Sequence, residues 1–242
     1  MAKLVQKSGY IKSGKASGYM RYIATREGVE KLAGNGSVTK GQRELIQKLL
    51  TDFPDAVELF EYEDYCKTPT LGTASAFISM ALDANLHEID SESGYMQYIA
   101  TRPRAQKRGI HGLFSSATAV DLASAISELE AHEGNVWTII YSLRREDADR
   151  LEYDNADAWR TLLMENAPTL AKSMKISLDN FHWYAAFHDE GHHPHIHMMV
   201  WSDDPKEGFL TKNGIAAMRS KLTNAIFRDE MQQIYERKDV AY

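Results

Sequence analysis

Histidines are concentrated in one ten-residue segment near the end of the chain, from His188 to His197. His195 and His197 are two residues apart in an apolar run that is typical of a buried strand, so their rings project from the same face of that strand. His188 ends an earlier strand-like run, residues 181–187. The six residues between His188 and His195 are enough to turn the chain into an antiparallel hairpin, so the spacing predicts that three imidazoles converge.

Three converging imidazoles can bind a single divalent metal ion, because neutral imidazole is the commonest protein ligand for transition metals. We therefore expect His188, His195 and His197 to hold such an ion. His192 and His193 fall in the turn and are not expected to contribute. A histidine-rich surface loop that scavenges metal is the alternative, and the apolar strand around the paired histidines argues against it.

The composition is that of an ordinary globular protein. The chain has 242 residues, of which 43% are hydrophobic, and this is enough to bury one sizeable core. Its single cysteine, Cys66, excludes an intramolecular disulfide and a thiolate metal site. The sequence has no run of about 18 apolar residues and no apolar leader at its start, so we expect a cytoplasmic protein without a membrane span.

Charge is distributed unevenly, although the formal net charge is −6. Residues 1–48 carry ten Lys and Arg against three Glu, whereas residues 51–93 carry ten acidic residues and one Lys. A second basic cluster follows later in the chain: Arg102, Arg104, Lys107 and Arg108. Local fields decide binding, so the two basic regions favour a nucleic-acid partner, with solvated charged faces as the alternative.

The chain contains one internal repeat. Residues 17–26 (SGYMRYIATR) recur as residues 93–102 (SGYMQYIATR), with nine of ten positions identical. In each copy two tyrosines and the last arginine are three and four residues apart, which places them on one face of a helix. A single pair of copies is too few for a solenoid, so we expect two related helical segments packed on a common core.

The remaining periodicity predicts a helical block followed by a sheet. Segments with helical spacing of apolar residues lie between the two copies of the repeat: 40–50, 55–65 and 73–89. Later segments include a buried strand at 136–143, a helix at 157–174, the two histidine-bearing strands and a closing helix at 212–237. This order predicts an α+β fold, a two-layer sandwich in which helices flank a mainly antiparallel central sheet, plus an N-terminal helical block.

These motifs resemble those of conjugative relaxases of the HUH endonuclease class, specifically the MobA/MobL (MobP-type) mobilisation group. The metal motif of that family has a histidine, an acidic residue in a short turn and then Pro-His-x-His, and His188, Glu190 and residues 194–197 are similar to it. Residues 22–28 (YIATREG) resemble its nucleophile motif. A weaker match is residues 141–146, which are similar to a serine-containing strand of the family.

We expect a single relaxase domain over residues 1–242, and the periodicity and the repeat add a helical insertion at about 35–92 and the duplicated helix at 17–26 and 93–102. The resemblance implies an HUH-type sandwich. The helical block and the duplicated motif depart from the minimal relaxase plan. The chain ends soon after its closing helix, so we expect either a compact enzyme or an isolated catalytic domain.

The activity implied by the resemblance is nicking of one DNA strand at the origin of transfer of a plasmid or integrative element. A tyrosine suits this reaction because the freed 3′-hydroxyl can later attack its phosphoester. We expect Tyr22 to form the covalent 5′-phosphotyrosyl intermediate, with Tyr98 and Tyr19 as alternatives. A divalent ion, Mn²⁺ or Mg²⁺ with Zn²⁺ as an alternative, would draw charge from the scissile phosphate. Glu190 would orient a ligand ring, or else be an exposed turn carboxylate.

Partners follow from the same resemblance. Four arginines would contact DNA phosphates: Arg21, Arg26, Arg102 and Arg104. The expected partners are single-stranded origin-of-transfer DNA, accessory mobilisation proteins and a type IV secretion coupling protein. Two other classes stay open. A noncatalytic DNA-binding accessory protein would bind DNA without a covalent adduct, and a histidine-triad nucleotide hydrolase would use its alternating histidines without a metal.

Overall fold

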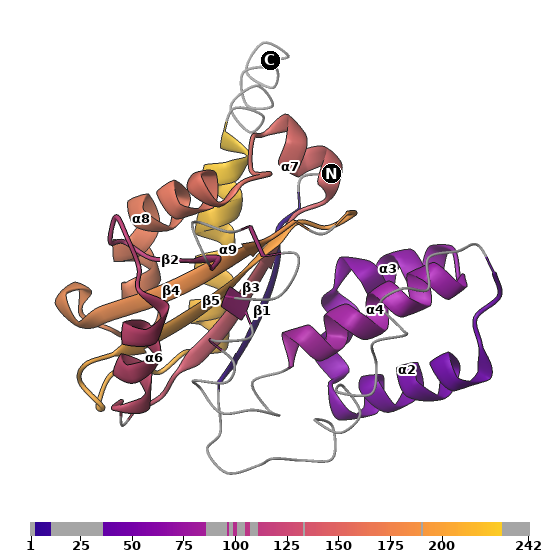
Figure 1. Cartoon of the computed structure of the whole chain (residues 1–242), viewed down its shortest axis with the longest axis horizontal. Coiled ribbons are helices and arrows are strands. Elements are labelled where there is room, and N and C mark those ends of the chain that lie inside the picture. Colours follow the sequence, from indigo (N-terminus) through magenta and orange to yellow (C-terminus); the bar gives the residue numbers. More distant parts are fainter. Residues whose placement is uncertain are drawn as a thin grey trace, which may run out of the picture. The chain divides into compact units, whose positions relative to one another are not determined.

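The structure is a computed structural model that describes these residues: 3–10, 36–85, 96, 99–100, 105–106, 111–132, 134–189 and 191–228. The chain divides into two compact units. The first combines Met1–Ser8 with Gln97–Tyr242, and the second comprises Gly9–Met96. The described part of the first unit holds a sheet with helices, whereas that of the second is mainly helical (Figure 1).

A five-stranded sheet organises the first unit, with strand order β1-β3-β5-β4-β2. Its strands are β1 (Val5–Tyr10), β2 (Leu113–Phe114), β3 (Trp137–Ser142), β4 (Phe181–His188) and β5 (His195–Ser202). The central strand β5 is antiparallel to both β3 and β4, and β4 is antiparallel to β2. The β4–β5 hairpin is paired along its whole length, from Phe181 opposite Ser202 to His188 opposite His195.

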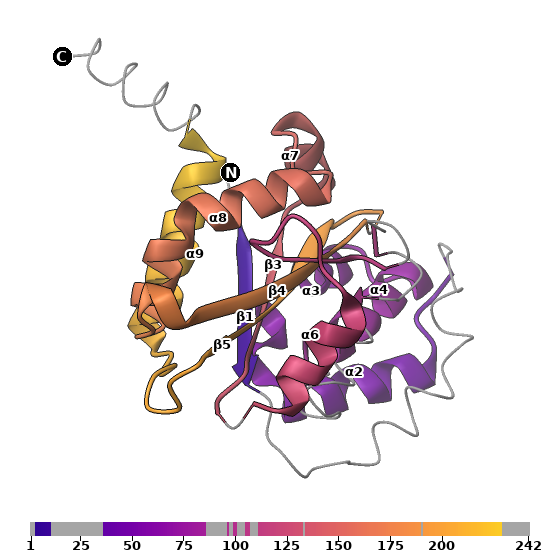
Figure 2. The same ribbon diagram turned by 60° about the vertical axis from the view of Figure 1, so that its left-hand side comes forward.

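Two long helices cover one face of this sheet (Figures 1 and 2): α8 (Ala156–Ser173) and α9 (Lys212–Ile226). Each begins at a side chain that accepts a backbone N–H, Asn155 for α8 and Thr211 for α9. The main hydrophobic core lies between these helices and the sheet. Its largest members include Trp159, Tyr141, Phe114, Phe187 and Phe227. This core fixes which face of each strand is turned away from α8 and α9.

The alternation of side chains along β5 assigns its histidines to the opposite face. Ile196, Met198 and Val200 belong to the core beneath α8 and α9, so the intervening residues point the other way. Part of that second face is covered by α6 (Leu122–Glu130), where Tyr184 donates a hydrogen bond to Glu128 at 2.9 Å. All eight residues of β5 are buried, including the two histidines.

Two short elements complete the described part of the first unit. Helix α7 (Arg145–Arg150) directly follows β3, and the 3₁₀ helix η3 (Leu178–Asn180) leads into β4. The placement of α7 matters for the site, because its first residue reaches the turn between β4 and β5.

The second unit contains α2 (Lys40–Asp52), the 3₁₀ helix η1 (Pro54–Glu58), α3 (Phe60–Lys67) and α4 (Leu71–Ala84). Thr39 and Thr70 begin α2 and α4 with reciprocal capping hydrogen bonds to the third helical residue. The Gln42 side chain of α2 donates to Ser75 Oγ at 2.8 Å and to the Leu71 carbonyl at 3.1 Å. These bonds join α2 to α4.

The α+β sandwich with its antiparallel sheet is confirmed. The helical segment expected at 55–65 is interrupted, because Leu59 has an extended backbone (φ −68°, ψ 143°) that separates η1 from α3. Elements β1, β2, α6 and α7 were not expected from periodicity, β1 because Gln6 and Lys7 make it look polar although both are buried. A single domain with an insertion at 35–92 stays a prediction. The repeat at 17–26 lies outside the described residues.

Candidate metal centre

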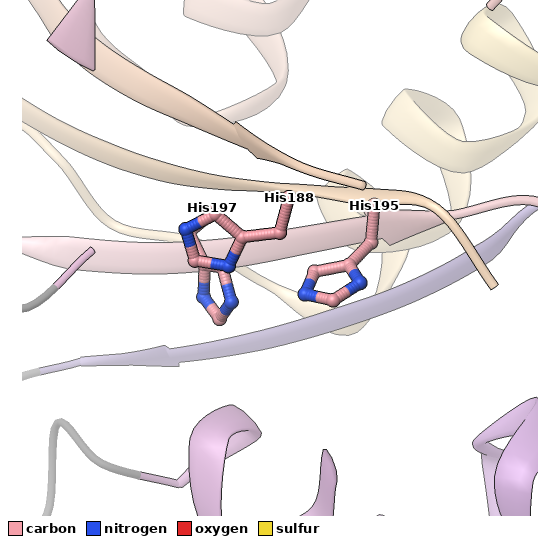
Figure 3. A group of neighbouring side chains, drawn as sticks. All are labelled: His188, His195 and His197. Carbon is pink, nitrogen blue, oxygen red and sulfur yellow. The ribbon is translucent and has the colours of Figure 1, made fainter. Parts of the chain in front are cut away.

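The three histidines of the expected metal motif lie side by side on one face of the sheet (Figure 3). His188 is the last residue of β4, His195 is the first residue of β5, and His197 follows two residues later on the same strand. Antiparallel pairing places His188 opposite His195 and Ala186 opposite His197. The hairpin therefore brings together residues from both of its strands, as the spacing predicted.

The geometry of the three rings suits one metal ion. Ring centroids are 4.5 Å apart for His188 and His197, 5.0 Å for His195 and His197, and 5.2 Å for His188 and His195. One ring nitrogen from each residue lies within 4.8 Å of the other two. Nitrogens that bind one ion at about 2.1 Å are at most about 4.2 Å apart, so the three rings already lie close to the separation that one ion requires.

Burial separates this cluster from a surface histidine loop. The relative exposures of His188, His195 and His197 are 0%, 1% and 0%. Placing three imidazoles together away from water is costly unless their ring nitrogens are engaged, and a bound cation would engage one nitrogen from each ring. Within the described part of the chain, no other group of three His, Cys, Asp or Glu side chains has this proximity.

Backbone carbonyls set the orientation of two of the rings. His188 Nε2 lies 2.9 Å from the Ile99 carbonyl oxygen, and His195 Nδ1 lies 3.0 Å from that of His193. A carbonyl oxygen only accepts, so each of these ring nitrogens carries the proton. The opposite nitrogen, Nδ1 of His188 and Nε2 of His195, then has the lone pair that a metal requires. Hydrogen bonds of this kind are typical around metal-ligating histidines, so the donor set fits a divalent ion.

The carbonyl that orients His188 belongs to the second copy of the repeat. Ile99 is 89 residues away from His188 in the sequence. The chain also approaches His188 at Ala105, which forms an isolated antiparallel bridge with it. Ile99, in the second copy, therefore lies next to His188, a relationship that the sequence did not reveal.

Ser142 is a polar residue at the site that sequence reasoning did not single out. It is paired with His195 across β3 and β5, so the two side chains share a face of the sheet. The residue is 1% exposed, and its hydroxyl has no hydrogen-bond partner among the described residues. One indication of its importance was present in the sequence: Ser142 lies in residues 141–146, which are similar to a serine-containing strand of the relaxase group.

Several residues expected at the site lie outside the described part of the chain, and their roles stay predictions. These are Tyr19, Tyr22, Tyr98, Glu190, Arg21, Arg26, Arg102 and Arg104. The ligand roles of the three histidines also stay predictions, supported by the geometry given above. Among the described helices, none is both long and apolar enough to cross a membrane.

Comparison with known proteins yields one match. The family model of MobL relaxases matches residues 1–241. Neither a curated protein nor a solved structure matches the chain.

Proposed function

The chain belongs to the MobL relaxases, and we propose on this basis that it nicks one strand of DNA at the origin of transfer of a plasmid or integrative element. The observation that carries the proposal is the buried cluster of His188, His195 and His197 on the β4–β5 hairpin. Such a cluster suits phosphoryl transfer, in which negative charge develops on a phosphate that must be held in place.

We assign the attack to Tyr22. Its phenolic oxygen would form a bond to the scissile phosphorus, and the bond from phosphorus to the 3′-oxygen would break. The phenol loses its proton and the departing 3′-oxygen gains one, so the products are a 5′-phosphotyrosyl protein and a free 3′-hydroxyl. One phosphodiester replaces another, which keeps the step reversible. A phenol has a pKa near 10 in water, so Tyr22 needs activation at neutral pH.

The three histidines would hold a divalent ion, Mn²⁺ or Mg²⁺ with Zn²⁺ as an alternative. When bound, such an ion would act as a Lewis acid toward a phosphate oxygen of the DNA. The protein's contribution is to present three neutral imidazoles in fixed tautomers, and the carbonyls of Ile99 and His193 support this for two of them. For Glu190 we propose the corresponding role of orienting a ligand ring.

Binding of the DNA is assigned to basic residues near the two copies of the repeat. Arg21, Arg26, Arg102 and Arg104 would contact phosphates of single-stranded origin-of-transfer DNA, which positions the strand without reading its sequence. The wider proposal includes a cytoplasmic location, accessory mobilisation proteins and a type IV secretion coupling protein as partners.

A covalent-adduct assay tests the activity. The protein is incubated with Mn²⁺ or Mg²⁺ and single-stranded DNA tiled across the region that flanks its gene, and denaturing gels reveal a protein–DNA adduct. We expect an adduct with wild type, Tyr19→Phe and Tyr98→Phe, and none with Tyr22→Phe. An adduct that disappears only in Tyr98→Phe would move the nucleophile to the second copy. DNA binding without any adduct would support the accessory-protein alternative instead.

A further inference from the structure

Arg145 connects α7 to the turn that joins the two histidine strands. His188 and His195 are the paired residues on either side of this turn, so an ordered turn keeps the hairpin closed at the end where two of the three candidate ligands lie. A six-residue turn without support from the rest of the protein has many conformations. Contacts that hold it therefore determine how well the rings are pre-positioned for an ion.

The contacts from Arg145 reach three positions of that turn. Its Nη2 donates to Asp189 Oδ1 at 2.6 Å, and its Nε donates to the Gly191 carbonyl at 3.1 Å. Its backbone N–H donates to the His192 carbonyl at 2.9 Å. The planar guanidinium can make the first two bonds at once because its donors point in fixed directions.

Neighbouring contacts hold Arg145 itself in place. Its Nη1 lies 3.3 Å from Asp149 Oδ1, one helical turn further along α7. Just before the helix, the Leu143 N–H donates to the Pro194 carbonyl at 3.2 Å, which attaches the end of the turn to the chain that leaves β3. The Arg145 side chain is 26% exposed, whereas Asp189 and Asp149 are 59% and 54% exposed, so solvent screens the ion pairs and the geometry of the hydrogen bonds matters more than their charge.

We propose that Arg145 is a positioning residue for the metal centre, which holds the turn so that His188 and His195 stand ready to bind one ion. The inference rests on the proposed metal-binding role of these histidines. In this assignment Arg145 acts on the ligands through the turn. Its loss would leave the three ligands present but would require the protein to order the turn when the ion binds, which lowers affinity.

The test compares Arg145→Met with Arg150→Met, a matched change at the other end of α7. Arg150 pairs with Asp147 inside the same helix. Mn²⁺ affinity is measured by calorimetry, and the absorption spectrum of bound Co²⁺ reports the ligand geometry. We expect Arg145→Met to bind Mn²⁺ about 10- to 100-fold more weakly with an altered Co²⁺ spectrum, the range seen when outer contacts of metal ligands are removed. Arg150→Met should match wild type.

Two milder variants protect the test from a folding failure. Arg145→Lys keeps the positive charge, but an ammonium group cannot donate to Asp189 and Gly191 in the fixed geometry of a guanidinium. Asp189→Asn removes the negative charge of the residue in the turn and so weakens the same ion pair. Both should bind Mn²⁺ more weakly than wild type while unfolding at a similar temperature in EDTA. Wild-type affinity in Arg145→Lys and Asp189→Asn would overturn the inference. Absence of metal binding by the wild-type protein would refute the metal centre itself, which is a separate outcome.

Discussion

His188 and His195 face each other directly across the β4–β5 hairpin, as the last residue of one strand and the first residue of the next. Their rings are 5.2 Å apart, and each has one nitrogen bonded to a backbone carbonyl. The pair is therefore held by the sheet register on one side and by main-chain acceptors on the other. This combination requires little rearrangement when an ion binds.

Replacing His195 should abolish tight metal binding. We expect His195→Ala to lower Mn²⁺ affinity by more than about 100-fold, because two imidazoles remain where three are needed and the effect should exceed that of losing an outer contact. His182→Ala is the control. His182 lies at the other end of the same hairpin, where its Nε2 is hydrogen-bonded to Asp203 Oδ2 at 2.6 Å. Calorimetric titration measures both variants, and equal affinities would contradict the assignment of His195 as a ligand.

Ser142→Ala should not destabilise the protein. The buried hydroxyl of Ser142 has no partner among the described residues, so its removal costs no hydrogen bond and relieves a desolvation penalty. We expect the free energy of unfolding to stay within about 0.5 kcal/mol of wild type or to rise. Ser202→Ala is the contrast, because Ser202 donates to Glu207 at 2.6 Å and should lose stability. Urea unfolding measures the stability of both variants, and a clear loss of stability in Ser142→Ala would reveal a hydrogen-bond partner for the hydroxyl.

Gly214→Ala should weaken the contact between α8 and α9. A methyl group at Gly214 would lie 2.4 Å from the Ser173 carbonyl oxygen, so the helices would have to separate. We expect a loss of about 1–3 kcal/mol in the free energy of unfolding. At Gly41 in α2 a methyl group would meet nothing within 4 Å, and Gly41→Ala should stabilise by up to about 1 kcal/mol. Chemical unfolding measures the free energy of unfolding of both variants. No loss of stability in Gly214→Ala would show that α8 and α9 can move apart at little cost in free energy.

Tyr184 should contribute to the loss of stability at high pH. Burial, together with the hydrogen bond to Glu128, raises the pKa of Tyr184 to about 12. The folded protein therefore favours the neutral phenol, and this contribution is complete below about pH 10 and is lost as the pH rises toward 12. The difference in tyrosinate absorbance between wild type and Tyr184→Phe reports the titration. A difference signal centred at pH 10 would contradict the prediction.

The histidine cluster could be anticipated from the sequence because its geometry is local. Alternation along a strand places His195 and His197 on one face, and a short turn returns the chain so that His188 meets them. Helix α8 could also be predicted, since its apolar residues, among them the buried Trp159, follow helical spacing over 18 residues. By contrast, β1 was missed because burial of Gln6 and Lys7 depends on the strands and helices that cover them.

Strand periodicity and turn length are enough to predict which three imidazoles project together, since all three lie within ten residues. What surrounds them depends on the packing of the whole chain. The Ile99 carbonyl is 89 residues from His188, Arg145 is 44 residues from Asp189, and Ser142 is in register with His195 across another strand. Such contacts depend on how separate elements pack on one core, and local periodicity does not predict that packing.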